Sequence, residues 1–324
     1  MTTRLRSATL AVSLLAAFAA PTIPAFAADK SVAITAIVEH PALDAARDGV
    51  KDELKAAGFE SGKNLKLDYQ SAQGNTGTAA QIARKYIGEK PDAIVAIATP
   101  SAQAVVAATK TIPIVYSAVT DPVAAKLVRS WAASGTNVTG VSDLSPLQRH
   151  LDLIKQIVPG VKKVGVIYSP GEANSVTIVN ALKKTAAAAG LTLVEAAAAR
   201  TVDVAGAAQS LVGKVDVIYA PTDNNVMSAF EGIVKVAQQA KLPVVAADTD
   251  AVKRGAVAAL GLNYYYLGRQ TGKLVGRIRK GEQPGAIASQ TSTTFELHVN
   301  PDAASKQGVL LSEALLSSAK VVIK

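Results

Sequence analysis

A turn in the first half of the chain has the chemistry of an anion site. Thr99, Pro100 and Ser101 follow a short apolar run that is long enough for a buried strand. We expect Thr99 to cap a helix with its hydroxyl and Pro100 to take the first helical position, because its missing N–H was unpaired anyway. The N–H groups of Ser101, Ala102 and Gln103 would then point out of the helix start, which favours a bound anion.

The next expected strand ends in a second turn of the same kind. The apolar run 111–115 precedes Ser117, Val119 and Thr120. Neighbouring parallel strands end at one edge of a sheet, which is where open α/β sheets bind ligands. A single such turn could be no more than a helix cap. The repetition favours a site for a carboxylate or a phosphate.

Carboxylates take the corresponding places in the second half of the chain. Glu172, Asp223 and Asp248 each follow an apolar run that is typical of a strand. If these acids were buried together with no positive charge nearby, their pKa values would be raised or the fold would be destabilised. A cationic group of a ligand would offset their charge. Any one of them, Asp223 above all, could instead be a helix N-cap. Neighbouring polar residues complete the candidate site: Asn174, Ser175, Asn224 and, from an N-terminal turn, His40.

An anion site that faces a cation site fits a zwitterion, and an α-amino acid is the commonest one. The first half of the chain would bind the carboxylate group, and the acids of the second half would bind the ammonium group. We expect the tyrosines at 264–266, at a crossing between the two halves, to pack the hinge, although Tyr264 could face the same cleft.

These turns belong to a chain that alternates strands and helices. Among its elements we expect strands over 163–168, 258–262 and 295–299, a helix from Thr78 to Gly88 that Thr78 caps, a helix that follows the turn 220–225 and runs to Ala240, and a helix over 303–316. Such alternation implies parallel sheets with right-handed crossovers. The segments 164–175 and 215–226 are similar to each other and to 92–103, which indicates one architecture used twice. We therefore predict an α/β fold of two doubly wound parallel-sheet lobes with a ligand cleft between them. Residues 28–143 and 264–290 would form lobe 1, and residues 144–263 and 291–324 would form lobe 2.

Residues 1–27 have the pattern of a cleaved signal peptide. A basic start and an apolar stretch precede Ala25, Phe26 and Ala27, which fit the small-x-small rule for cleavage. The apolar stretch is too short for a stable membrane span. The chain has no cysteine, so it has no disulfide, no thiolate metal ligand and no site for a lipid anchor. We expect an exported, periplasmic protein.

The charge and the motifs exclude other classes of function. The chain has 34 basic and 25 acidic residues, but the bases stand singly on expected helices, so we expect no nucleic-acid partner. It has three histidines and lacks a nucleophile elbow, a phosphate-binding loop and a metal-spaced His/Glu cluster. We therefore expect no enzyme, no cofactor and no bound metal.

Seven segments together carry a resemblance to a known family. They are EHPALDAARDGVKDEL (39–54), ATPSAQA (98–104), YSAVTDPV (116–123), TNVTGVSD (136–143), YSPGEANS (168–175), PTDNNV (221–226) and GLNYYYLGRQTGKL (261–274). The chain resembles the type I periplasmic substrate-binding proteins of ABC transporters, and most closely the subfamily that includes tryptophan- and tyrosine-binding members. The resemblance implies two lobes joined by three crossing segments, closure on a ligand and docking on a membrane permease. It also implies carboxylate capture by the turns 99–103 and 117–120 and amino-group capture by acids of lobe 2.

We therefore expect a monomeric substrate-binding protein of an ABC importer. Its ligand would be a small zwitterion, an aromatic or branched-chain amino acid, bound between the lobes. The scarcity of tryptophan, with one residue, and of phenylalanine, with five, argues against a sugar site. A sensing protein that partners a membrane receptor would have the same site, and a different small organic acid is the alternative ligand.

Overall fold

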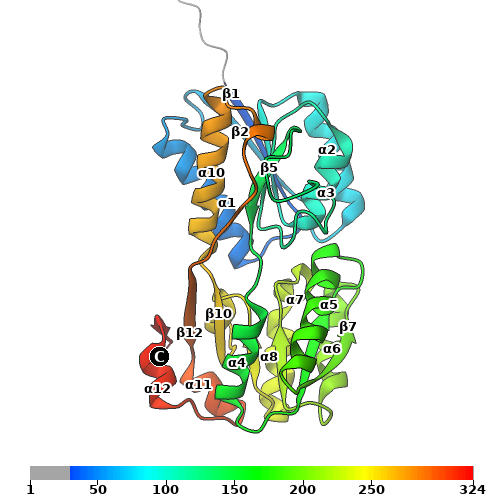
Figure 1. The fold of residues 1–324 in the computed structure, drawn as a ribbon, viewed down its shortest axis with the longest axis vertical. Coiled ribbons are helices and arrows are strands. Elements are labelled where there is room, and N and C mark those ends of the chain that lie inside the picture. The colour runs from blue at the N-terminus through cyan, green and yellow to red at the C-terminus, as the bar shows by residue number, and fades with distance from the viewer. Residues whose placement is uncertain (1–29, 324) are drawn as a thin grey trace, which may run out of the picture.

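The computed structural model describes residues 30–323, and the predicted signal peptide lies outside these residues. The chain forms two α/β lobes, one above the other in Figure 1, each built round one sheet. The first sheet contains β1 (Lys30–Ala36), β2 (Leu65–Ser71), β3 (Ala93–Ile97), β4 (Ile114–Ser117), β5 (Val138–Ser142) and β11 (Gln290–Thr291). Its strand order is β11-β5-β4-β3-β1-β2, and all its pairings are parallel.

The second sheet repeats this arrangement. It contains β6 (Lys163–Tyr168), β7 (Thr192–Ala197), β8 (Val217–Ala220), β9 (Val244–Ala246), β10 (Ala258–Leu262), β12 (Phe295–Val299) and β13 (Val321–Val322). Its order is β13-β12-β10-β9-β8-β6-β7, so the run β10-β9-β8-β6-β7 matches β5-β4-β3-β1-β2 of the first sheet. β12 departs from the predicted all-parallel sheet, because it pairs antiparallel with β10.

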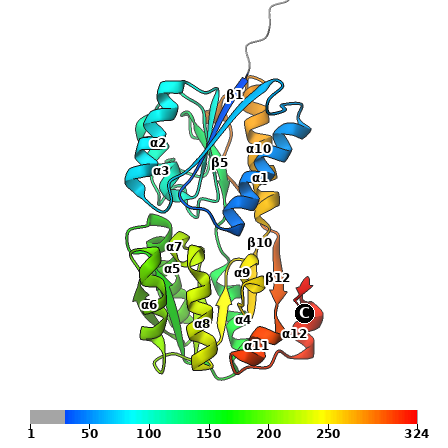
Figure 2. The same ribbon diagram turned by 180° about the vertical axis from the view of Figure 1, so that it is seen from behind.

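Helices cover both faces of the first sheet. They are α1 (Pro41–Ala56), α2 (Thr76–Glu89), α3 (Thr99–Ala108) and α10 (Tyr264–Arg279). Figures 1 and 2 show α1 and α10 together on one face and α2 and α3 on the other. Gly49 and Gly268 let α1 and α10 meet backbone to backbone, since a Cβ on Gly268 would overlap the carbonyl of Ala46 and one on Gly49 would overlap that of Tyr265.

The other helices lie in lobe 2. They are α4 (Leu147–Ile157), α5 (Ala173–Ala188), α6 (Val204–Leu211), α7 (Asn224–Ser228), α8 (Phe230–Ala240), α9 (Asp250–Lys253), α11 (Pro301–Lys306) and α12 (Glu313–Ser318). No helix in residues 30–323 combines the length and the apolar character needed to cross a membrane.

The chain passes between the two sheets three times. The passages run from β5 to α4, from β10 to α10 and from β11 to β12, which confirms the three crossing segments. The lobe boundaries given above stay a prediction. The turns after β3, β4, β8 and β9 lie at the carboxyl ends of their strands, where open α/β sheets bind ligands. Residues of all four turns line one cavity, so each sheet presents this edge to the other lobe.

Local predictions were wrong at four places. Thr99 does not cap α3, because the helix already includes it and Ala98 takes the cap position without a side-chain bond. Asn75, not Thr78, caps α2, and its Oδ1 accepts from the backbone N–H of Thr78 at 2.9 Å. The helix expected after the turn 220–225 begins earlier, at Asn224, and breaks at Ala229 into α7 and α8. The expected helix over 303–316 is two helices, α11 and α12, because the backbone leaves the helical conformation at Gly308, whose φ is +80°.

Candidate ligand-binding site

A small cavity of about 20 Å³ lies between the two lobes. All but one of its lining residues are buried, and Thr222 is half-buried, so solvent hardly reaches it. Lobe 1 and the crossing segments contribute His40, Leu43, Ala98, Thr99, Ala118, Thr120, Asp143 and Tyr264. Lobe 2 contributes Asn174, Thr222, Asp223, Asn224, Met227 and Asp248.

Unpaired polar atoms concentrate around this cavity. In residues 30–323, eleven buried side-chain nitrogen and oxygen atoms lack a hydrogen-bond partner, and five of them belong to lining residues. These five are His40 Nδ1, Asp143 Oδ1, Asn174 Oδ1, Thr222 Oγ1 and Asp248 Oδ2. Because an unpaired buried polar group costs about 1–3 kcal/mol, their concentration points to a polar ligand that completes them.

The lobe 1 side of the cavity is built from strained turns and an uncapped helix. Ala98 and Ala118, which follow β3 and β4, have φ values of +71° and +53°. Alanine in this conformation costs about 1–2 kcal/mol, and such strain is found at ligand sites. The turn at Ala98 leads directly into α3, whose first N–H groups have no side-chain cap. The start of α3, with the hydroxyl of Thr99 beside it, is therefore suited to a carboxylate.

Two acids with a free oxygen each face the cavity near the crossing segments. Asp248 Oδ1 accepts from the N–H of Asp250 at 2.9 Å, and Asp143 Oδ2 accepts from the hydroxyl of Tyr264 at 2.7 Å. Burial, and then the charge of Asp250, raise the pKa of Asp248 to about 7. Burial also raises the pKa of Asp143. An ammonium group placed between them would satisfy both free oxygens.

Asp223 is held by the protein itself. Its carboxylate accepts from the N–H and the hydroxyl of Ser169 at 2.6 and 2.8 Å, from the hydroxyl of Ser175 at 2.5 Å and from the N–H of Val226 at 2.9 Å. It caps α7 and ties the ends of β6 and β8 together. Burial raises its pKa, but its oxygens are already occupied, so its role as an N-cap accounts for its position.

Glu172 lies behind the cavity and orients two amides that line it. Its Oε2 accepts from the Nδ2 groups of Asn174 at 3.0 Å and Asn224 at 2.5 Å. Burial, and then the charge of Asp223, raise the pKa of Glu172 to about 7. With Nδ2 committed to Glu172, Asn174 presents an unpaired Oδ1, which is an acceptor for a ligand donor.

The remaining predicted residues are buried or half-buried near the cavity without lining it. Ser117 bonds through its hydroxyl to that of Thr271 on α10 at 2.8 Å, and Gln103 donates to the carbonyl of Ala125 at 3.2 Å. Ser175 serves Asp223. Ser101, Ala102 and Val119 are fully buried beneath the turns that do line the cavity.

Six lining residues escaped the sequence reasoning. Asp143 follows β5 as Asp248 follows β9, so the rule that found the other acids also applies to it. Thr222 sits beside a predicted residue. The four others are apolar, and no signal separates them from ordinary core residues: Leu43, Ala98, Ala118 and Met227.

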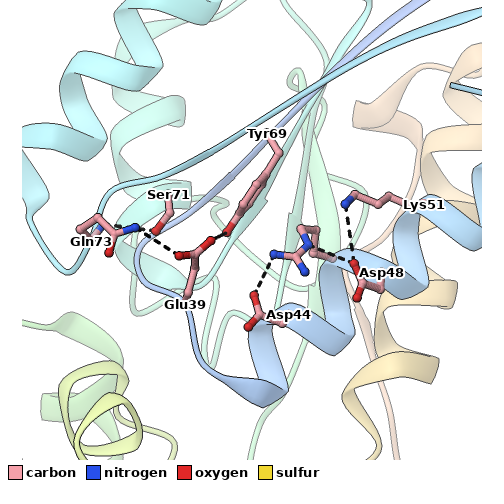
Figure 3. A network of polar contacts seen from close by, with 8 residues as sticks. Glu39, Asp44, Asp48, Lys51, Tyr69, Ser71 and Gln73 are labelled. Carbon is pink, nitrogen blue, oxygen red and sulfur yellow. Dashed lines mark hydrogen bonds and ion pairs between the residues drawn. The ribbon is translucent and has the colours of Figure 1, made fainter. Parts of the chain in front are cut away.

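His40 reaches the cavity from a turn that a surface network fixes. Burial, and then the charge of Arg254, lower the pKa of His40 to about 3, so its ring is neutral at pH 7. The preceding Glu39 accepts from the hydroxyl of Tyr69 at 3.3 Å and from Nε2 of Gln73 at 3.2 Å (Figure 3). Tyr69 therefore supports this turn from outside and does not line the cavity.

The residues that the structure describes contain no cluster of side chains suited to a metal ion. Across residues 30–323, no three His, Asp or Glu side chains come close enough together to hold an ion. The acids, amides and helix start that line the cavity can bind a polar organic molecule through hydrogen bonds and charge.

Comparison with known proteins agrees with this chemistry. A tyrosine-binding protein from Clostridioides difficile (strain R20291) is 41% identical over 273 residues, which cover 84% of this chain and 79% of the relative. A Streptococcus pneumoniae ABC domain in complex with L-Trp is 34% identical, with a TM-score of 0.88 over 91% of this chain and all of that one.

A third protein resembles this chain more closely in sequence than in structure. It is a ligand-free, open substrate-binding protein with adhesive properties from Clostridium difficile, 41% identical, with a TM-score of 0.69 over 91% of this chain and 99% of that one. Although its sequence is more similar than that of the L-Trp complex, its structure is less so, which places this chain nearer the arrangement of the L-Trp complex. The model of a family described as ABC transporter substrate-binding proteins matches residues 31–323, and the chain therefore belongs to that family.

Proposed function

We propose that this protein is the substrate-binding component of an ABC importer and that its ligand is an amino acid bound in the cavity between the lobes. The observation that carries the proposal is the set of five buried, unpaired polar atoms around one cavity. Members of the family bind a solute and do not catalyse a reaction, so the site needs only affinity and selectivity.

The two ends of an amino acid match the two sides of the cavity. Its carboxylate would meet the uncapped start of α3 beside Thr99 and Thr120. Its ammonium group would meet the free oxygens of Asp248 and Asp143. Since one relative is named for tyrosine and another contains L-Trp, we propose an aromatic amino acid rather than a branched-chain one.

Closure of the lobes would supply the affinity. The lining residues are almost entirely buried, so a ligand can enter only when the lobes separate about the crossing segments. Closing then removes ligand and lining atoms from water together, which strengthens the charged hydrogen bonds.

The direct test is calorimetric titration of the mature protein with the twenty L-amino acids and with D-tyrosine. We expect saturable binding of L-tyrosine or L-tryptophan and much weaker binding of D-tyrosine. Absence of binding by every amino acid would contradict the amino-acid proposal, and binding of a non-amino acid in a wider metabolite screen would replace it.

The importer role and the location need separate tests. We propose an exported, periplasmic monomer whose mature chain begins at Ala28. Deletion of the gene should reduce uptake of the labelled ligand, and the mature N-terminus should be found in the periplasmic fraction. Unchanged uptake combined with tight binding would favour sensing over transport.

A further inference from the structure

The guanidinium of Arg279, the last residue of α10, is buried and only partly paired. Its side chain is 5% exposed, and its Nη1 bonds to Oδ1 of Asp92 at 2.8 Å. Its Nε and Nη2 are buried and have no hydrogen-bond partner among the described residues. A buried donor without an acceptor is unfavourable, and more so in a charged group. Arg279 therefore holds two unpaired donors on one edge of its guanidinium, and the packing of lobe 1 gives no reason for them.

The two carboxylates beside Arg279 are occupied by other donors. Asp92 Oδ2 accepts from the N–H and the hydroxyl of Ser31 at 2.7 and 3.3 Å. Glu282 accepts from Nε and Nη2 of Arg277 at 2.6 Å each. This second pair also shows what such an edge does when an acceptor is present, because it binds both oxygens of one carboxylate. The same edge of Arg279 lacks that partner.

Arg279 lines a pocket of about 260 Å³ on lobe 1. Ligand pockets usually measure about 300–1,000 Å³, so this one suits a small molecule. Lys30, Asp92 and Pro113 also line it, and they stand at the amino ends of β1, β3 and β4. Figure 1 shows the start of β1 at the end of lobe 1 that is remote from lobe 2.

This pocket is separate from the cavity between the lobes. The turns that line the interlobe cavity lie at the carboxyl ends of β3 and β4, and the Arg279 pocket lies at the amino ends of the same strands. β1 has seven residues, so the length of a strand sets the two sites about 20 Å apart.

The charges around the pocket favour an anion. Its ionisable lining residues are Lys30, Arg279, Asp92 and Glu282, and Glu282 is paired with Arg277. Three bases therefore face two acids, and both acids already accept from donors of the protein. Lys30 is exposed, so its ammonium group can move toward a bound anion.

We propose that this pocket is a second ligand site, which binds a small oxyanion through Nε and Nη2 of Arg279. Two parallel N–H groups match two oxygens of a carboxylate or of a phosphate group. The Nη1 bond to Asp92 fixes the guanidinium in place, and Lys30 adds charge at the rim. This site goes beyond amino-acid binding and does not depend on it.

The first experiment titrates the mature protein with inorganic phosphate and with acetate, at an ionic strength kept constant with chloride. The proteins are wild type, Arg279→Lys and, as a control, Arg84→Lys on the exposed side of α2. Lysine keeps the charge beside Asp92 but has no planar edge. We expect saturable binding to wild type, a loss of at least about 10-fold in Arg279→Lys and no change in Arg84→Lys. The anion that binds more tightly identifies the phosphate or the carboxylate class.

The second experiment follows the Nε–H resonance of Arg279 by NMR during the same titration of wild type. We expect this resonance to shift with the occupancy of the site, and the Nε–H resonance of Arg277, which Glu282 already holds, to stay in place. This measurement needs no variant, and circular dichroism checks that the variants fold.

Three results would overturn the proposal. They are no saturable binding of either anion, equal binding by Arg279→Lys, and an Arg279 resonance that does not move. Displacement of the anion by L-tyrosine would also overturn it, because the anion would then occupy the interlobe cavity. If wild type binds an anion at Arg279 but binds no amino acid, the proposed function fails and this site stands.

Discussion

Replacing Asp248 by asparagine should stabilise the empty protein at pH 8, although it weakens ligand binding. Asp248 Oδ1 accepts from the N–H of Asp250, and an amide oxygen can accept the same bond. Asp248 Oδ2 is buried without a partner. Because burial disfavours the charged carboxylate, Asp248→Asn removes an unfavourable ion and keeps the shape of the side chain.

The size of the effect follows from the pKa of Asp248, which is raised from 3.8 to about 7. The folded protein holds this proton where the unfolded chain has lost it, so the contribution of Asp248 to stability falls as the pH rises from about 4 to about 7. The whole difference corresponds to roughly 4 kcal/mol. About 3 kcal/mol of it falls between pH 5 and pH 8.

The assay is urea unfolding of both proteins without ligand at pH 5, 6, 7 and 8. His40 and His150, whose pKa values burial lowers to about 3 and about 4, act in the opposite direction over part of this range. The difference between the two proteins therefore reports Asp248, whereas the slope of either alone does not. A variant less stable than wild type at pH 8, or a difference that does not change with pH, would refute the reasoning.

Three further predictions concern the packing and charges around the site. Gly268→Ala should lower the free energy of unfolding by about 2 kcal/mol or more, because the added Cβ would overlap the backbone of α1. Gly88→Ala should raise it by up to about 1 kcal/mol, because the added Cβ meets open space in α2. Calorimetry that ranks the two variants the other way would contradict this packing. Asp223→Ala should lower the free energy of unfolding, measured in urea, by about 3 kcal/mol or more, because it leaves buried donors without an acceptor. An unchanged free energy of unfolding would mean that the carboxylate is dispensable. His150 bonds to the Tyr219 hydroxyl at 2.7 Å and the Leu260 carbonyl at 2.8 Å, so NMR titration should find its ring neutral above pH 5, and its contribution to stability should fall as the pH drops from 6.5 to about 4.

The architecture could be predicted from the sequence because its signals are local. Strands 163–168, 258–262 and 295–299 were expected with the bounds that the structure gives them. Short elements near the C-terminus could not be predicted so well, since Val309, Leu310 and Leu311 continue an apolar pattern beyond the point where Gly308 ends α11. The antiparallel pairing of β12 depends on a return of the chain, which periodicity does not reveal.

The candidate site was half visible in the sequence. Thr99, Thr120 and Asp248 line the cavity because strand ends direct them there, and that rule is readable from a sequence. The sequence does not show whether the protein itself supplies hydrogen-bond donors to a carboxylate. Asp223 and Asp248 both follow strands, yet Asp223 accepts from four donors and Asp248 keeps one oxygen unpaired. Such differences depend on side chains brought together from distant segments.

The contact between α1 and α10 has a consequence for how the chain is made. The two helices, residues 41–56 and 264–279, are neighbours through Gly49 and Gly268 but are separated by about two hundred residues of sequence. A growing polypeptide therefore cannot finish its first lobe until most of the second has been synthesised. The side of α1 that packs against α10 stays uncovered during that interval. Contacts between segments so far apart in sequence slow folding, and apolar surface exposed meanwhile favours aggregation.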